Sequence, residues 1–242
     1  MSEQAAALPA HWYVVPAAGS GSRFGGTRPK QYAALAGRAL LLWTIEALLT
    51  SVPRGILVVV SEHDPWIDEL ALASLSPTIE IHRTGGATRA RSVAAGLAAL
   101  DGRAEERDLV LVHDAARPCL APANITALLR RAADHADGAL LALPVVETVK
   151  EAGPDDTIRG TRARDGLWLA QTPQAFGFRR LRDALEAALG AEQEITDEAS
   201  AIEQAGGAPA LVAGDRANLK VTRPEDLAFA EAWLGRRGAM GA

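Results

Sequence analysis

The chain has 242 residues, which is enough for one large α/β domain or two small ones. Hydrophobic residues make up 48% of it, which is enough for a substantial core. Its formal net charge of −5 argues against a general nucleic-acid binder and a polybasic membrane binder, and no apolar run reaches transmembrane length. Cys119 is the only cysteine, so no intramolecular disulfide can form and a cytoplasmic location is expected.

Predicted strands and helices alternate along the first 145 residues. Strands are expected at residues 12–18, 55–60, 79–82, 108–112 and 139–145. Helices are expected at residues 40–49, 63–73, 88–100 and 122–133. Thr88 is a candidate N-cap for the third of these helices. The alternation predicts an α/β fold with a Rossmann-like, doubly wound, mainly parallel sheet covered on both faces.

Residues 144–168 interrupt this alternation. The segment has few apolar residues, several charges and a turn at residues 153–156. Its few apolar residues are spaced as in two thin strands, which predicts a protruding β-hairpin arm. Because so thin a hairpin is not stable alone, it is expected to pack on a second subunit, and a mobile loop is the alternative.

Helices resume after the arm. They are expected at residues 178–189 and 197–205, the second capped by Thr196. Short strands are expected at residues 210–213 and 219–221, and a last helix runs from Pro224 to about residue 234. No linker is evident, so residues 1–242 are predicted to form a single domain that carries the arm.

A glycine-rich loop with three nearby cations, Arg23, Arg28 and Lys30, follows the first predicted strand. A backbone without side chains can approach a polyphosphate closely, and the cations can bind the same oxygens. The loop is not a P-loop, since Thr27 stands where Lys is required. It is not a dinucleotide fingerprint either, since Phe24 replaces the third glycine. A phosphate-binding loop is therefore favoured over a glycine-rich surface turn.

Two further segments could contribute to a site at the same edge of the sheet. Asp114 ends a predicted strand, where its carboxylate could hold Mg²⁺ or merely cap the next turn. Arg117 could bind a second anion or pair with a surface acid. The turn at residues 85–86 enters a helix and could hold a base or ribose, with Ser92 as a donor to the base, or simply be a tight connection.

Six segments in chain order together resemble the 2-C-methyl-D-erythritol 4-phosphate cytidylyltransferase family. They are residues 16–23, 29–32, 112–118, 167–174, 196–200 and 220–226. The first segment is shared with many nucleotidyltransferases, whereas the later segments, taken together, are specific to this family and its close relatives. The resemblance implies a nucleotidyltransferase-type sheet and an enzyme that transfers CMP from CTP to the sugar phosphate, releasing pyrophosphate. It also implies Mg²⁺, and a homodimer whose arm reaches into the partner's site.

The resemblance also implies residue roles. Residues that stabilise the transferring phosphate or position the acceptor would be Arg23, Lys30, Arg164 and Lys220. CTP would be held by Ala17, Ala18, Gly19, Gly86, Ser92 and Ala115. The acceptor site would be lined by Arg117, Thr148, Thr172 and Thr196, and Asp114 would lie by the magnesium.

Three other functions compete with this interpretation. A pentitol-phosphate cytidylyltransferase, for example one acting on ribitol 5-phosphate, would share the CTP side and differ in the acceptor pocket. A non-catalytic nucleotide-sensing module would bind CTP without releasing pyrophosphate. A Rossmann oxidoreductase is disfavoured by Phe24. Ala90, where many relatives carry Gln, leaves the details of the base contacts open.

Overall fold

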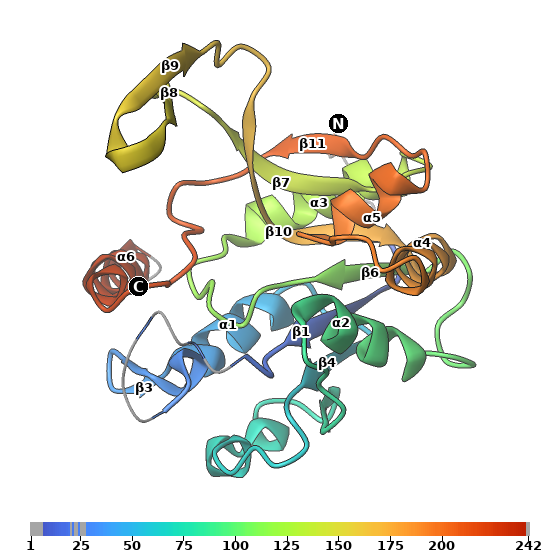
Figure 1. The fold of residues 1–242 in the computed structure, drawn as a ribbon. Helices are drawn as coiled ribbons and strands as arrows, with labels where there is room; N and C mark the ends of the chain where they lie inside the picture. The colour runs from blue at the N-terminus through green and yellow to red at the C-terminus, as the bar shows by residue number, and fades with distance from the viewer. Residues whose placement is uncertain (1–6, 20, 22–23, 25–27, 241–242) are drawn as a thin grey trace, which may run out of the picture.

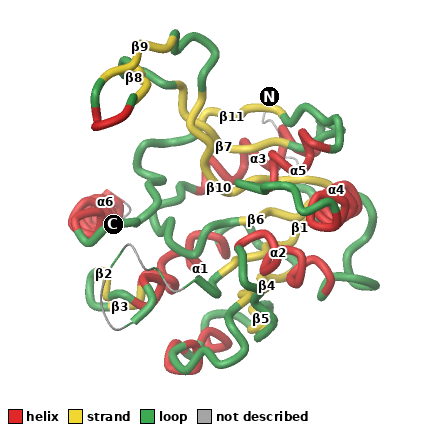
Figure 2. Tube along the Cα trace, viewed as in Figure 1, coloured by secondary structure: helices red, strands yellow, loops and turns green. Residues whose placement is uncertain are grey.

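The computed structural model describes residues 7–19, 21, 24 and 28–240 of the chain. Its centre is a seven-stranded sheet with the order β11-β7-β10-β6-β1-β4-β5 (Figures 1 and 2). The strands are β1 (His11–Pro16), β4 (Gly55–Val59), β5 (Ile79–His82), β6 (Leu109–Val112), β7 (Ala139–Pro144), β10 (Trp168–Gly177) and β11 (Ala210–Ala213). Only β10 runs antiparallel to its neighbours, β6 and β7, so the sheet is mainly parallel as predicted.

Helices cover both faces of the sheet, as a doubly wound fold requires. The helices are α1 (Leu40–Leu49), α2 (Arg89–Ala98), α3 (Pro122–Ala133), α4 (Phe178–Gly190), α5 (Glu198–Gln204) and α6 (Glu225–Met240). One core contains buried residues of α1 and α3, and the other contains buried residues of α2, α4 and α5. Among the described residues, no helix is both long and apolar enough to cross a membrane.

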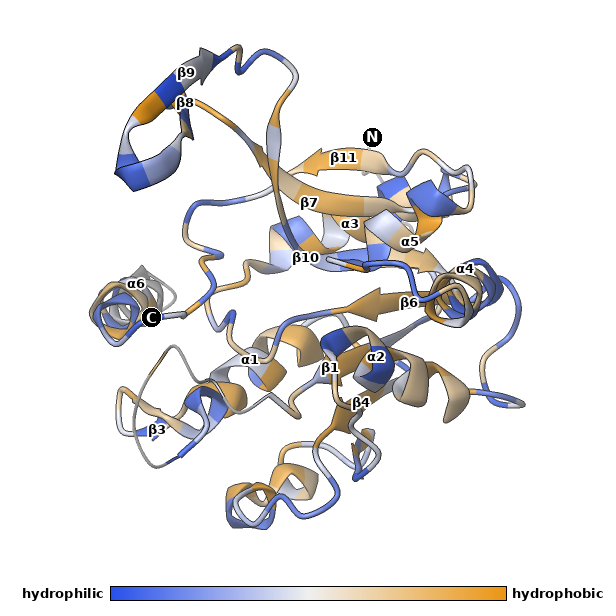
Figure 3. Cartoon of the chain, in the orientation of Figure 1, coloured by the Kyte–Doolittle hydropathy of each residue, from blue (hydrophilic) through white to orange (hydrophobic). Residues whose placement is uncertain are grey.

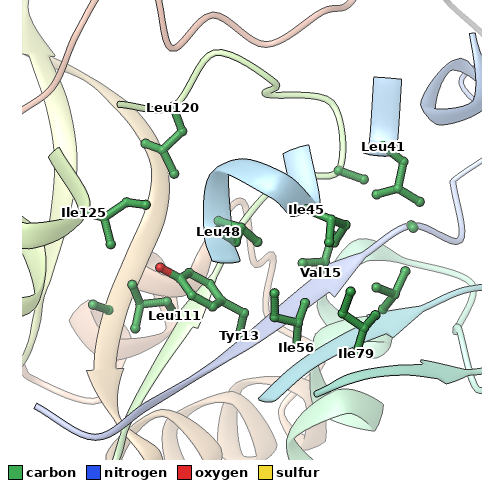
Figure 4. Close-up of a cluster of buried hydrophobic side chains, with 14 of the residues drawn as sticks. Tyr13, Val15, Leu41, Ile45, Leu48, Ile56, Ile79, Leu111, Leu120 and Ile125 are labelled. Atoms are coloured by element: carbon green, nitrogen blue, oxygen red, sulfur yellow. The ribbon is translucent and has the colours of Figure 1, made fainter. Parts of the chain in front are cut away.

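Strand β1 shows how the sequence pattern builds the two cores. Tyr13 and Val15 belong to the core under α1, whereas Trp12 and Val14 belong to the core under α2, because successive side chains of a strand point to opposite faces. Figure 4 shows Tyr13 below Leu48 and Val15 below Ile45, both residues of α1. Strands β6 and β7 are coloured mostly hydrophobic in Figure 3, as expected for strands of a sheet that is buried on both faces.

Most predicted elements are confirmed. The helices predicted at residues 40–49 and 122–133 and the strand at 210–213 match α1, α3 and β11 residue for residue. The side chain of Thr88 caps α2 by accepting a hydrogen bond from the backbone nitrogen of Arg91. The cap predicted for α5 is wrong, because Asp197 rather than Thr196 is its N-cap, within a capping box formed with Ser200.

The helix predicted at residues 63–73 is two short 3₁₀ turns instead, η2 (Ile67–Leu70) and η3 (Leu72–Ser74). The carboxylate of Asp64 accepts hydrogen bonds from the backbone nitrogens of Trp66 and Ile67, which favours a local turn. Ala71 then adopts a left-handed conformation with φ of 46°, so an α-helix cannot continue through it.

In the last third of the chain, one strand was not predicted and one predicted strand is absent. Strand β10 is central but was not predicted, because its segment contains Pro173, which removes a backbone donor. A register shift between Ala170 and Gln174 accommodates that proline. Residues 219–221 are not a strand but a loop, which is fixed by a hydrogen bond from the nitrogen of Val221 to the carbonyl of Ala116.

The arm predicted at residues 144–168 exists as a separate two-stranded sheet. Strands β8 (Val149–Ala152) and β9 (Ile158–Arg162) pair antiparallel and project away from the main sheet, at the upper left of Figure 1. A second small sheet, β2 (Ala34–Leu35) with β3 (Arg38–Ala39), packs against α6, and a 3₁₀ turn, η1 (Lys30–Tyr32), precedes it. A last 3₁₀ turn, η4 (Pro154–Asp156), joins β8 to β9.

Candidate active site

A cavity of about 560 Å³ opens at the carboxyl ends of β1 and β6. This is the edge of the sheet where ligands of doubly wound folds bind. All six positions that the resemblance assigns to CTP line it: Ala17, Ala18, Gly19, Gly86, Ser92 and Ala115. The strand ends therefore bring together segments that are far apart in the sequence.

Buried polar side chains hold the two glycine turns of this cavity. The amide of Gln31 donates to the carbonyl oxygens of Ala17 at 2.7 Å and Gly19 at 3.2 Å, which ties η1 to the first loop. Ser92 accepts a hydrogen bond from the backbone nitrogen of Gly86, while its hydroxyl donates to the carbonyl of Thr88. The hydroxyl of Ser92 therefore donates its hydrogen bond within the turn and not towards the cavity.

Lysines from two distant segments line the same cavity. Lys30 donates from Nζ to the carbonyl of Val221 at 3.1 Å, and Lys220 precedes that residue. Val221 is fully buried in a small core with Leu35 of β2 and Ala230 of α6, so the segment that carries Lys220 is fixed although it is not a strand. Arg23 lies outside the described residues.

The carboxylate of Asp114 is the centre of a cluster of cations. Its oxygens lie 3.0 Å from Nε of Arg89, 3.0 Å from Nζ of Lys220 and 3.3 Å from Nε of Arg117. Burial by itself raises the pKa of Asp114, but the charges of Arg89, Lys220 and Arg117 outweigh it and hold that pKa far below the usual range. Asp114 is therefore ionised at neutral pH.

Sequence reasoning missed one member of this cluster, Arg89, and its anchor Glu198. Arg89 pairs with Glu198 through two hydrogen bonds, of 2.7 and 3.0 Å, and the side chain of Glu198 has no exposed surface. An acidic residue such as Glu198 at the start of a helix is expected for its favourable interaction with the helix dipole alone, so it gives no signal of a partner. No sequence motif has a spacing that would predict a contact between Glu198 and Arg89, which is at the start of α2.

A second cavity of about 290 Å³ shares Arg89, Asp114 and Lys220 with the first. Three of the four predicted acceptor-site residues line it: Arg117, Thr172 and Thr196. The fourth, Thr148, is exposed on the arm and lines neither cavity, and the same holds for Arg164. Arg164 donates instead to the carbonyl of Val146 within the arm. The described part of one chain does not bring the two arm residues to the cavities.

A hydrogen-bond chain connects β6 to β10 behind the cluster. The nitrogen of Asp114 donates to Oγ1 of Thr172 at 3.0 Å, and Oγ1 lies 3.1 Å from Nδ1 of His113. Nε2 of His113 lies 3.2 Å from the carbonyl of Arg117, which can only accept, so Nε2 carries the proton and Nδ1 accepts from Thr172. Burial lowers the pKa of His113 to about 4, so the imidazole is neutral at pH 7.

The described residues contain no group of three or more His, Cys, Asp or Glu side chains that could hold a metal ion. Among the described residues lining the larger cavity, Asp114 is the single carboxylate. A divalent ion here would need most of its ligands from a bound substrate and water, which is the usual way proteins bind Mg²⁺ beside phosphates.

Known proteins of one family match almost the whole length of this chain. A family model described as 2-C-methyl-D-erythritol 4-phosphate cytidylyltransferase matches residues 12–236. Proteins of that name from Dechloromonas aromatica and Chromobacterium violaceum are 48% and 50% identical, over 95% and 93% of this chain and 100% and 97% of their own.

Solved structures give the same result. A crystal structure of a 4-diphosphocytidyl-2C-methyl-D-erythritol synthase has a TM-score of 0.80 at 37% identity and covers 93% of this chain and 99% of its own. The 2-C-methyl-D-erythritol 4-phosphate cytidylyltransferase of Thermus thermophilus has a TM-score of 0.76 at 32% identity, with 93% and 98% covered. The chain therefore belongs to the 2-C-methyl-D-erythritol 4-phosphate cytidylyltransferase family.

Proposed function

We propose that the two adjoining cavities are where this cytidylyltransferase transfers CMP from CTP to 2-C-methyl-D-erythritol 4-phosphate. The larger cavity would hold CTP, with Ala17, Ala18 and Gly19 contacting the nucleotide through the backbone. The observation that carries the proposal is that Lys30, Lys220 and Asp114 line the same cavity as this glycine loop. Gly86, Ser92 and Ala115 would complete the CTP site.

The reaction needs charge compensation more than it needs a base. An oxygen of the acceptor phosphate, already anionic, attacks the α-phosphorus of CTP, and the bond to the β-phosphate breaks to release pyrophosphate. Two such charges 4 Å apart repel by about 4 kcal/mol at an effective dielectric constant of 20, or about a thousandfold in rate. Lys30 and Arg23 would offset this charge on the nucleotide, and Lys220 would do so on the acceptor.

The smaller cavity suits the acceptor. Arg117 supplies a guanidinium there, and Thr172 and Thr196 supply hydroxyl oxygens. The hydroxyl of Thr172 already donates a hydrogen bond to His113. Thr172 would therefore accept a hydrogen bond from a hydroxyl of the sugar phosphate rather than donate one to its phosphate. Arg164 and Thr148 would reach the same cavity from the arm of a second copy of the chain.

We propose a homodimer on this basis. The arm and the adjoining start of β10 expose large apolar side chains: Val146, Ile158, Leu167, Trp168 and Leu169. A two-stranded arm with such an apolar surface needs to be covered, and a second subunit would cover it.

We further propose that residues 1–242 act as a single domain and that the enzyme is cytoplasmic, since its single cysteine forms no internal disulfide.

Magnesium is proposed as the divalent ion. The donor set suits an ion that is bound chiefly by the triphosphate, with Asp114 as the nearest protein carboxylate. When bound, the ion would neutralise part of the triphosphate charge. Chelation by EDTA should stop pyrophosphate release, and added Mg²⁺ should restore it.

A pyrophosphate-release assay tests the proposed function. The protein is given CTP, ATP, GTP or UTP with 2-C-methyl-D-erythritol 4-phosphate, with ribitol 5-phosphate, or without an acceptor. Release is expected only when CTP and the methylerythritol phosphate are both present. Faster turnover of ribitol 5-phosphate would overturn the acceptor, and CTP binding without any release would favour the nucleotide-sensing module.

A further inference from the structure

Arg89 occupies a position that helix electrostatics disfavour. It is the first residue of α2, where the helix dipole is positive and an acidic residue would be preferred. Its guanidinium pairs there with the carboxylates of Asp114 and Glu198. Arg89 also lines both cavities, so it stands at the wall that they share.

We propose that Arg89, anchored by Glu198, is a positioning residue for the transfer. It would fix the carboxylate of Asp114 and, through it, the cations that face the two phosphates. This inference rests on the proposed function above, because it assigns the two cavities to CTP and the acceptor.

The geometry divides the two oxygens of Asp114 between different partners. Nε of Arg89 contacts Oδ1, and Oδ2 is left to Lys220 and Arg117. Without Arg89 the carboxylate could rotate and offer both oxygens to the other two cations. Lys220, which is more exposed than Arg117, would then leave its place at the shared wall.

Glu198 makes this arrangement rigid. Its two oxygens take the Nη1 and Nη2 atoms of Arg89 in a planar fork, which only an arginine can form. Glu198 is the first residue of α5, where the helix dipole favours its charge. A buried ion pair is weak evidence for stability, because apolar residues of similar volume often replace one at no cost. A positioning role explains why the pair is present.

The double variant Arg89→Met/Glu198→Leu separates positioning from folding, because it removes both charges together. We expect a thermal midpoint near that of the wild type, and kcat/KM for the acceptor about 100-fold lower, as for a misplaced catalytic group. The dissociation constant of CTP, measured by calorimetry, should change by less than about threefold. The single variant Arg89→Lys keeps the charge but not the fork and should also lose activity.

The control is the pair Arg180–Asp137, 3.0 Å apart, which joins α4 to the loop before β7 and lines neither cavity. The double variant Arg180→Met/Asp137→Leu should leave turnover unchanged. If Arg89→Met/Glu198→Leu folds and its kcat/KM for the acceptor stays within about twofold of the wild type, the proposal is overturned. An equal loss of CTP affinity and of kcat/KM would overturn it as well.

A second variant keeps the inference testable if the double variant does not fold. Glu198→Gln preserves the shape and leaves Arg89 its contact with Asp114, so kcat/KM for the acceptor should fall by about 3- to 10-fold. No change in Glu198→Gln would overturn the proposal. A wild-type protein that releases no pyrophosphate would instead contradict the proposed function, so the two failures can be told apart.

Discussion

The hydroxyl of Thr172 donates to Nδ1 of His113 across the antiparallel pair of β10 and β6, at 3.1 Å. The same hydroxyl oxygen accepts from the backbone nitrogen of Asp114. The two residues therefore hold the end of β6, and with it the carboxylate that faces the cations, against β10. Neutral His113 is a condition for this arrangement, because an imidazolium would have no acceptor for Thr172.

Protonation of His113 should make the protein less stable as the pH falls. The folded pKa is about 4 and the ordinary value is 6.5, so the unfolded chain binds the proton more tightly. The contribution is fully present above pH 6.5 and is lost towards pH 4, with about 2 kcal/mol lost between pH 7 and pH 5. Urea unfolding at these two pH values measures it.

His113→Asn is the matched variant, because it keeps an acceptor for Thr172 but does not titrate. The free energy of unfolding of this variant should depend on pH less steeply than that of the wild type, by about 2 kcal/mol over the same interval. The same pH dependence in both proteins would mean that His113 is not buried in its neutral form.

Lys30→Ala should reduce turnover about 100- to 1000-fold while weakening CTP binding by less than about tenfold. The reason is that repulsion between two phosphates peaks as they approach, when the fixed charge matters most. Single-turnover rates and equilibrium CTP binding measure the two effects. Arg179→Ala is the control, since Arg179 of α4 is exposed and pairs with exposed Asp183, and such surface pairs contribute little. Near-normal turnover of Lys30→Ala would contradict its role.

The sequence predicted the edge of the sheet that holds the site, because the carboxyl ends of parallel strands lie at one edge and ligands of such sheets bind there. Asp114 and Gly86 could be placed there because each follows a predicted strand. Lys220 lines the larger cavity, but its segment is held there by buried Val221 and not by the strand predicted at residues 219–221. β10 was missed because a proline argues against a central strand, and a register shift that accommodates it leaves no local signal.

Contacts between distant residues were beyond sequence reasoning. Arg89 and Glu198 come from helix starts on different parts of the chain, and each alone looks like an ordinary surface charge. Their pairing depends on how α2 and α5 pack on one face, which is a tertiary property. The place of Arg164 was inferred from resemblance, and one chain leaves it on the arm, away from the cavities.

Arg164→Ala should raise the KM for the sugar phosphate and leave CTP binding unchanged, because we assign Arg164 to the partner's acceptor cavity. Co-expression with Lys30→Ala then tests whether sites are shared. Half of the dimers would contain both variants, and one of their two sites would be intact, so about a quarter of wild-type activity should return. Arg162→Ala, in the same arm but paired with Glu151 at 2.8 Å, is the control and should be active. No recovery on co-expression would place Arg164 in the site of its own chain.

Gly85→Ala should disrupt the packing between the turn at residues 85–86 and the glycine loop that begins at Ala18. A Cβ at residue 85 would lie 2.4 Å from Cβ of Ala18 and 2.7 Å from the carbonyl oxygen of Val60, so one of the two turns must move. We expect a loss of about 1–3 kcal/mol in stability, as for other overpacked sites.

The displaced turn should also weaken CTP binding, because Ala18 lines the nucleotide cavity. Gly190→Ala is the control: the added Cβ meets nothing within 4 Å at the end of α4, and alanine favours a helix by up to about 1 kcal/mol. The same chemical change should therefore destabilise at residue 85 and stabilise at residue 190, as measured by thermal unfolding. If Gly85→Ala unfolds and binds CTP like the wild type, the two turns do not support each other and the nucleotide cavity does not depend on their contact.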